Sequence, residues 1–169
     1  MKRGAAKKIA FGGVMAALAV VVMCLGTMIP VATFVCPMIC AMILALVHGL
    51  TGTRVAWAWY GAVSILSLLL APDKEAAAVF VFLGYYPIVK PWIDRRRLPV
   101  VWKLALFNIS IFAMYSLLIR LFGMDQILAE FQELGTVMTV VTLALGNVTL
   151  FMLDVLLGRL GQKMSRRKG

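Results

Sequence analysis

Six long runs of apolar residues follow one another along the chain, and a short polar segment separates each run from the next. A helix adds about 1.5 Å per residue, so one crossing of a hydrocarbon core about 30 Å thick requires about 20 mostly apolar residues. We therefore expect six transmembrane helices, at residues 9–30, 31–49, 55–71, 76–89, 100–122 and 136–160. Together they predict an all-α, polytopic six-helix bundle that forms a single integral membrane domain over residues 1–169.

Two of these runs depart from a regular crossing. The fourth is short, and we expect it to include residues 72–75 in its first turn, because carboxylates there favour the positive end of the helix dipole. Pro30 and Pro37 leave little room for a connection into the second run. For that run a kinked or re-entrant element is the alternative to a regular crossing.

Basic residues are concentrated in alternate connections. Every lysine and arginine except Lys74 and Arg120 lies in the first tail, the second loop, the region of the fourth loop or the last tail. Because basic loops stay in the cytoplasm, this pattern predicts a multi-pass protein of the cell membrane with both termini cytoplasmic. The net charge of +10 accompanies a mean hydropathy of +0.97, and the charges lie at helix ends, so we expect contact with the lipid bilayer and no nucleic-acid partner.

Few residues suit catalysis or metal binding. The chain has one histidine, and its three cysteines lie inside apolar runs, where we expect them to be packed. No pair of carboxylates lies within a span, and no glycine-rich phosphate loop occurs. We therefore expect no enzymatic activity, no cofactor and no metal site.

The first run carries small residues at helical spacing. A stripe of small side chains lets another backbone approach closely, which favours helix association in a membrane. The partner is either another helix of this chain or another subunit. The residues concerned are Ala6, Ala10, Gly13 and Ala17, with Gly12 and Ala16 beside them.

The segment Lys7–Val21, the small size and the expected cytoplasmic termini resemble the substrate-binding S components of energy-coupling factor (ECF) transporters. The resemblance implies a vitamin-binding or micronutrient-binding subunit of an ATP-driven importer, without ATPase activity of its own. Its implied partners are a transmembrane coupling subunit and two ATPase subunits. In that family an alanine-x-x-x-alanine surface of the first span docks on the coupling subunit. Here Gly13 and Ala17 supply the small-x-x-x-small version, and Ala6 and Ala10 match it literally.

The resemblance also implies a substrate pocket near the outer face, closed by the loops after spans one, three and five. Each candidate residue has a structural alternative: a solvated turn, an arginine that extends to the headgroups, or hydrogen bonds between helices. The candidate substrate-binding residues are Asp73, Lys74 and Glu75 in the third-span loop, Asn108, Tyr115, Ser116 and Arg120 in the fifth span, and Thr139, Thr142 and Asn147 in the sixth.

Two further interpretations complete the prediction. The segment Gly84–Pro87 lies toward the cytoplasmic end of the fourth span, where we expect its tyrosines to anchor the helix at the membrane interface. The alternative function is that of a structural or assembly membrane protein, whose small-residue stripe recruits another membrane partner and which binds no solute.

Overall fold

The computed structural model describes residues 2–26, 32–122, 140–141 and 144–161, and every regular element within these ranges is a helix. The helices are α1 (Lys2–Leu25), α2 (Ala32–Thr51), α3 (Thr53–Leu70), α4 (Lys74–Leu83), α5 (Tyr86–Ile93) and α6 (Pro99–Phe122), followed by a C-terminal helix at Ala144–Gly161. The prediction of an all-α fold is confirmed.

Five helical segments of the described chain are long and apolar enough to cross a membrane. They are Ala6–Leu25, Thr33–Thr51, Thr53–Leu70, Lys74–Ile93 and Ala144–Gly161, and α6 is apolar over Pro99–Met114. The fourth of these segments contains both α4 and α5. Each of the six predicted spans thus corresponds to a helix or a pair of helices, and the polytopic membrane bundle is confirmed.

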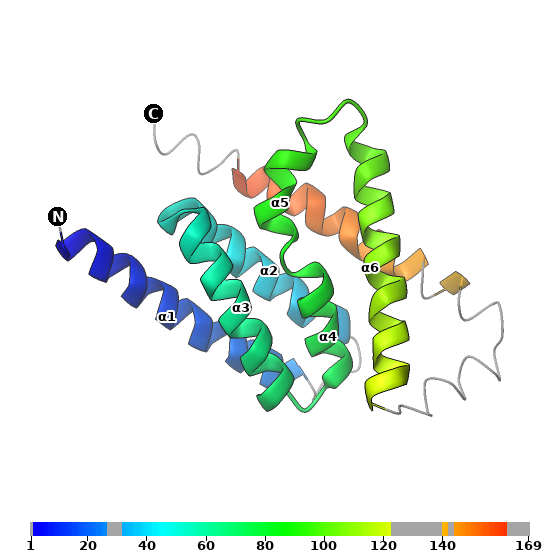
Figure 1. Ribbon diagram of the computed structural model, residues 1–169, viewed down its shortest axis with the longest axis horizontal. Helices are drawn as coiled ribbons and strands as arrows, with labels where there is room; N and C mark the ends of the chain where they lie inside the picture. The colour runs from blue at the N-terminus through cyan, green and yellow to red at the C-terminus, as the bar shows by residue number, and fades with distance from the viewer. Residues whose placement is uncertain (1, 27–31, 123–139, 142–143, 162–169) are drawn as a thin grey trace.

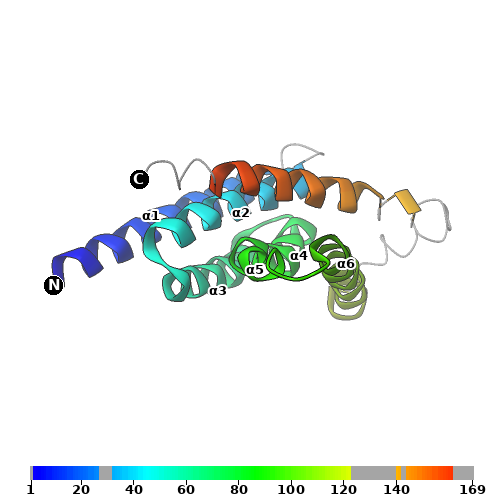
Figure 2. The ribbon, with the colours of Figure 1, turned by 90° about the horizontal axis from the view of Figure 1, so that it is seen from above.

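The helices form two layers. In one layer α3, the α4–α5 pair and α6 lie side by side, and in the other α2 and the C-terminal helix lie across them (Figures 1 and 2). Helix α1 packs along α2 and α3 at one side of the molecule. Helix α2 and the C-terminal helix of one layer therefore face α4 and α6 of the other layer.

Helix α2 is continuous through Pro37, so the second run forms one helix long enough to cross a membrane and not a re-entrant element. It connects to α3 through a single residue outside the helices, Gly52. The φ angle of Gly52 is 96°, a left-handed conformation that side chains with a Cβ atom rarely adopt. Glycine thus allows α2 to reverse into α3 within one residue.

The predicted first turn of the fourth span is confirmed in part. Asp73 is the N-cap of α4, and its side chain accepts a hydrogen bond of 3.0 Å from the backbone N–H of Ala76. This contact satisfies one of the backbone donors that a helix start leaves without an intrahelical partner. Glu75 lies in the first helical turn, while Pro72 precedes the cap.

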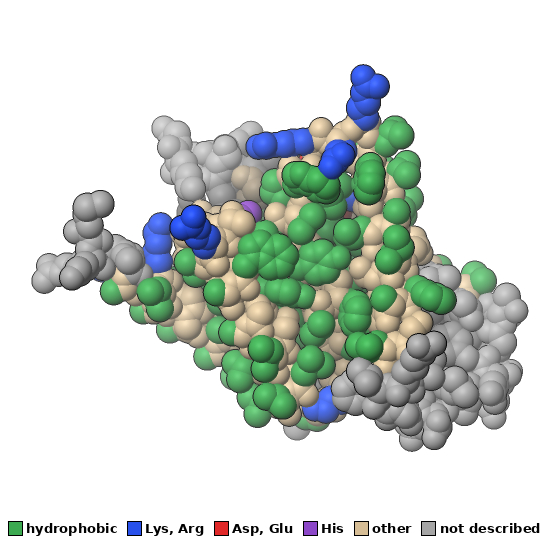
Figure 3. All heavy atoms as spheres, viewed as in Figure 1, with side chains coloured by type: hydrophobic (Ala, Val, Ile, Leu, Met, Phe, Trp, Pro, Cys, Tyr) green, Lys and Arg blue, Asp and Glu red, His purple; other side chains and the backbone are tan. Residues whose placement is uncertain are grey.

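Charged and apolar side chains occupy different parts of the surface. Lysine and arginine side chains lie toward the ends of the helices, and hydrophobic side chains cover the flank between them (Figure 3). Large apolar side chains are strongly exposed in several helices, for example Leu69 at 71% and Phe112 at 77%. Such a surface suits a lipid environment. We call the end formed by the α2–α3 turn and the α5–α6 loop the basic end, because Arg54 and the segment Arg95–Arg97 lie there.

Candidate functional site

The fourth span is broken into α4 and α5 at Gly84 and Tyr85. Pro87 has no N–H to donate to the carbonyl of Leu83 one turn earlier, and its ring crowds that carbonyl, so the helix cannot continue regularly. The backbone N–H of Gly84 bonds to the carbonyl of Phe80 at 2.7 Å and so caps the C-terminal end of α4. On the other side of the break the N–H of Ile88 bonds to the carbonyl of Tyr85 at 3.0 Å. Discontinuous helices inside membrane proteins often border binding sites.

A small cavity of about 30 Å³ lies beside this break, between α2, α4, α6 and the C-terminal helix. Leu83 and Gly84 bring the end of α4 to its wall. The other lining residues are Phe34, Pro37, Met38, Ala41, Val79, Ile111, Met114, Gly146, Thr149, Leu150 and Leu153. The cavity lies on the side of the break away from the basic end, since the α2 residues that line it come from the first half of that helix.

The cavity wall is almost entirely apolar. Thr149 contributes the only polar side chain among the lining residues, and its hydroxyl donates a hydrogen bond of 2.7 Å to the carbonyl of Leu145 in its own helix. At Gly146 a Cβ atom would lie 3.0 Å from Cδ1 of Ile111, so glycine lets α6 and the C-terminal helix approach closely. No titratable side chain is among the lining residues, so the wall offers van der Waals contact and no acid–base chemistry.

The predicted loop residues Asp73 and Lys74 make structural contacts. Besides capping α4, Asp73 accepts a hydrogen bond of 3.0 Å from the hydroxyl of Thr33 in α2. Lys74 donates to the carbonyls of Leu68 and Ala71 at 2.9 Å each, which satisfies carbonyls at the end of α3. These contacts join α2, α3 and α4 at the end opposite the basic end.

The structure brings together one predicted residue from each of the fifth and sixth spans. The amide of Asn147 donates to the side-chain oxygen of Asn108 at 3.4 Å, and Asn108 donates to the carbonyl of Leu104 at 2.8 Å. Ser116 is half-buried two turns further along α6. None of the three is among the cavity-lining residues, so the asparagines form a contact between helices beside the cavity.

Four of the predicted residues are outside this description. Thr139 and Thr142 lie outside the described residues. Tyr115 and Arg120 belong to α6, but their side chains are not among those described. For these four the substrate-binding role stays a prediction.

The small residues of α1 divide between two faces. Gly12 is buried and lies against α3, where an added Cβ atom would be 3.9 Å from both Val55 and Trp59. Ala16 is partly buried against the core formed by α1, α2 and α3. The positions at Ala6, Ala10, Gly13 and Ala17 are exposed, and an added Cβ atom at Gly13 would meet nothing within 4 Å. This stripe therefore faces away from every described helix of the chain.

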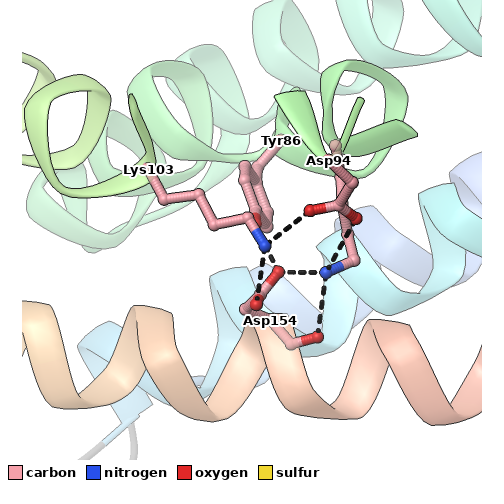
Figure 4. A network of polar contacts seen from close by, with 5 residues as sticks. Tyr86, Asp94, Lys103 and Asp154 are labelled. Atoms are coloured by element: carbon pink, nitrogen blue, oxygen red, sulfur yellow. Dashed lines mark hydrogen bonds and ion pairs between the residues drawn. The ribbon is translucent and has the colours of Figure 1, made fainter. Parts of the chain in front are cut away.

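A network of charged side chains connects three helices near the basic end (Figure 4). Asp154 of the C-terminal helix accepts hydrogen bonds from Tyr86 and Lys90 of α5, and its second oxygen lies 3.0 Å from Nζ of Lys103 in α6. Asp94 completes the network, with its oxygens 3.5 Å from Nζ of Lys90 and 2.6 Å from Nζ of Lys103. Two carboxylates and two ammonium groups thus balance each other, as charges within a membrane span require.

The network was missed by the sequence analysis. The pattern of basic residues places Lys90 and Lys103 in the region of the fourth loop and does not pair them with Asp154, which lies within the sixth predicted span. The expectation that the tyrosines of Gly84–Pro87 anchor the helix at the interface is wrong for Tyr86, which is fully buried and bonds to Asp154. The sequence does contain one signal for the network, which is Asp154, because an acid inside an apolar run requires a partner from another helix.

A second, wider hollow of about 310 Å³ lies at the basic end between α2, α5 and the C-terminal helix. Its polar side chains are His48, Lys90 and Asp94. Lys90 and Asp94 already bond within the ion network, and His48 lies 3.2 Å from the hydroxyl of Thr53. The hollow therefore presents charged groups that are satisfied by the protein itself.

Comparison with known proteins adds no assignment. A scan against protein-family models, a search of curated proteins and a search of solved structures each gave no match.

Proposed function

We propose that the chain is the solute-binding membrane subunit of an ATP-driven importer of the ECF type and is itself without ATPase activity. In this role it captures a small solute within its bundle, and a membrane coupling subunit with two ATPase subunits supplies the energy. The exposed small-residue stripe of α1 is the observation that carries the proposal.

The stripe suits a helix-docking surface because it is both smooth and unoccupied by the chain's own described helices. Ala10, Gly13 and Ala17 are exposed, and they lie on the face of α1 away from α2 and α3. In lipid, where apolar surfaces gain little from meeting each other, close backbone approach along small residues is a main source of helix association. This geometry fits docking on another subunit better than it fits internal packing.

Two other features support the proposal. The apolar cavity beside the break in the fourth span gives a solute a place inside the bundle. The basic end carries the α2–α3 turn and the α5–α6 loop, so the positive-inside rule favours placing this end in the cytoplasm of a cell-membrane protein. The cavity then lies toward the outer side, from which an importer receives its solute.

The test is purification of the tagged full-length chain from its native host in mild detergent, followed by mass spectrometry of the accompanying proteins. We expect a membrane subunit and two ATPases to accompany the chain. The variant Gly13→Leu/Ala17→Leu places large side chains on the stripe, so we expect it to lose these partners.

A matched control is available on α3. Ala58 and Ala62 are also exposed and spaced by four residues, so Ala58→Leu/Ala62→Leu makes a comparable change on another face. We expect this variant to keep the partners. Recovery of the unmodified chain alone, or with unrelated membrane proteins, would contradict the importer role and favour a structural or assembly function.

A further inference from the structure

We propose that the part of the solute that enters the bundle is a small group that is uncharged and apolar. This inference rests on the proposed function and names the class of substrate that its cavity accepts.

The lining of the cavity decides the class. A charged group inside it would lose its hydration and find no opposite charge among the described lining residues, of which Thr149 alone has a polar side chain. The nearest network of charges, around Asp154, is already paired and involves no lining residue. An uncharged apolar group loses nothing on entering and gains contact with the aromatic ring of Phe34 and the aliphatic side chains around it.

The cavity also has the means to adapt. Its volume of about 30 Å³ is smaller than a ring, so binding requires the wall to yield. Met38 of α2 and Met114 of α6 lie on different walls, and methionine side chains are flexible and readily change shape. A third wall belongs to α4, and this helix ends at the cavity, at the break at Gly84.

A lipid tail fits this position less well than a solute does. The wall is built from four helices of both layers, so an occupant contacts helices of both layers at once. Residues of the flank, such as Phe112 and Ile109 of α6, point away from it and are exposed. The occupant is therefore a molecule that enters the bundle.

The experiment uses three probes that share one benzene ring and differ in charge: toluene, benzoate and benzylammonium. Binding to the purified full-length chain in lipid nanodiscs is measured by equilibrium dialysis, and uptake by empty nanodiscs of the same lipid is subtracted. We expect saturable binding of toluene and roughly hundredfold weaker binding of both ions, the penalty that an unpaired charge meets within a membrane span.

Cavity-filling variants locate the site. Gly146→Leu adds a side chain against Ile111, and Ala41→Val adds two methyl groups from α2, so we expect toluene binding to weaken about tenfold or more. Gly61→Leu is the matched control, because an added Cβ atom there meets nothing within 4 Å. We expect it to bind toluene like the unmodified chain. If Gly146→Leu fails to fold, toluene binding to Ala41→Val still shows whether the probe occupies the cavity.

Either of two results would overturn the proposal: tighter binding of an ionic probe than of toluene, or toluene binding that both filling variants leave unchanged. The outcomes also separate this inference from the importer role. If the coupling partners accompany the chain but toluene does not bind, the substrate class is wrong and the importer role stands. If toluene binds in the cavity but no ATPases accompany the chain, the importer role is wrong and the substrate class of the cavity stands.

Discussion

The apolar cavity and the ion network share α6 and the C-terminal helix, yet different kinds of contact hold the two regions together. Leu153 lines the cavity, and the next residue, Asp154, is the centre of the network. Gly84 lies at the cavity wall, and Tyr86, two residues later, bonds to Asp154. Within one turn of the C-terminal helix, van der Waals contacts between apolar side chains give way to ion pairs and hydrogen bonds. The strength of these polar contacts depends on the position of every partner.

Rigidity is distributed unevenly between the two regions. Apolar side chains that face each other in a membrane are attracted only weakly and can shift past one another, so a cavity between them adapts. A network of partly buried charges loses stabilisation when one partner moves away, because the remaining charge is then left without its counter-charge. We infer that the network fixes the C-terminal helix against α5 and α6, while the cavity walls stay adjustable.

Removing the carboxylate of Asp154 should have the largest effect on stability. Asp154→Asn keeps the shape but leaves Lys90 and Lys103 with Asp94 as their only anionic partner. We expect a loss of about 3 kcal/mol in the free energy of unfolding, at the low end for the removal of one partner of a buried ion pair, because Asp154 and its two lysine partners are only partly buried. The measurement is reversible unfolding of the purified chain in mixed detergent micelles.

A second substitution tests the cause of that loss. Lys103→Met, added to Asp154→Asn, removes one of the two cations that then share Asp94, so we expect part of the lost stability to return. Full stability in Asp154→Asn alone would mean that the network contributes nothing to holding the three helices together.

A smaller loss is expected on the cavity side of the same turn. Leu153 is 2% exposed, and Leu153→Ala removes apolar contacts and enlarges the cavity. We expect a loss of about 2 kcal/mol in the free energy of unfolding, at the low end for such substitutions because the wall can adjust. Leu145→Ala, at a strongly exposed position of the same helix, is the control and should have almost no effect. A loss at Leu153 as large as that at Asp154 would remove the distinction between the two regions.

The sequence predicted the helices better than it predicted their contacts. Apolar runs and basic loops indicated six spans, because the membrane imposes both features directly on the sequence. It did not indicate the cavity, since nearly every residue of a span is apolar and the pattern does not show which faces meet. Nor did it indicate the network, whose partners Lys90 and Asp154 are 64 residues apart. Pro87 was visible, but the break it causes in the fourth span was not inferred.

The smallest effect is expected at the pair formed by Asn108 and Asn147. The sequence predicted both residues as substrate-binding, and the structure brings them into contact. The two amides bond across helices at 3.4 Å, beside the cavity and not within its wall. A cycle of Asn108→Ala, Asn147→Ala and the double variant should give a coupling energy of about 0.6 kcal/mol in unfolding, as is typical between membrane helices.

The same variants separate a contact between helices from a contact to the solute. If the pair serves packing alone, toluene binding should be the same in both single variants, because neither side chain lines the cavity. If either variant weakened toluene binding while the coupling energy was zero, the asparagine would be a ligand contact. The boundary of the solute site would then extend from the apolar wall to the polar stripe that the sequence indicated.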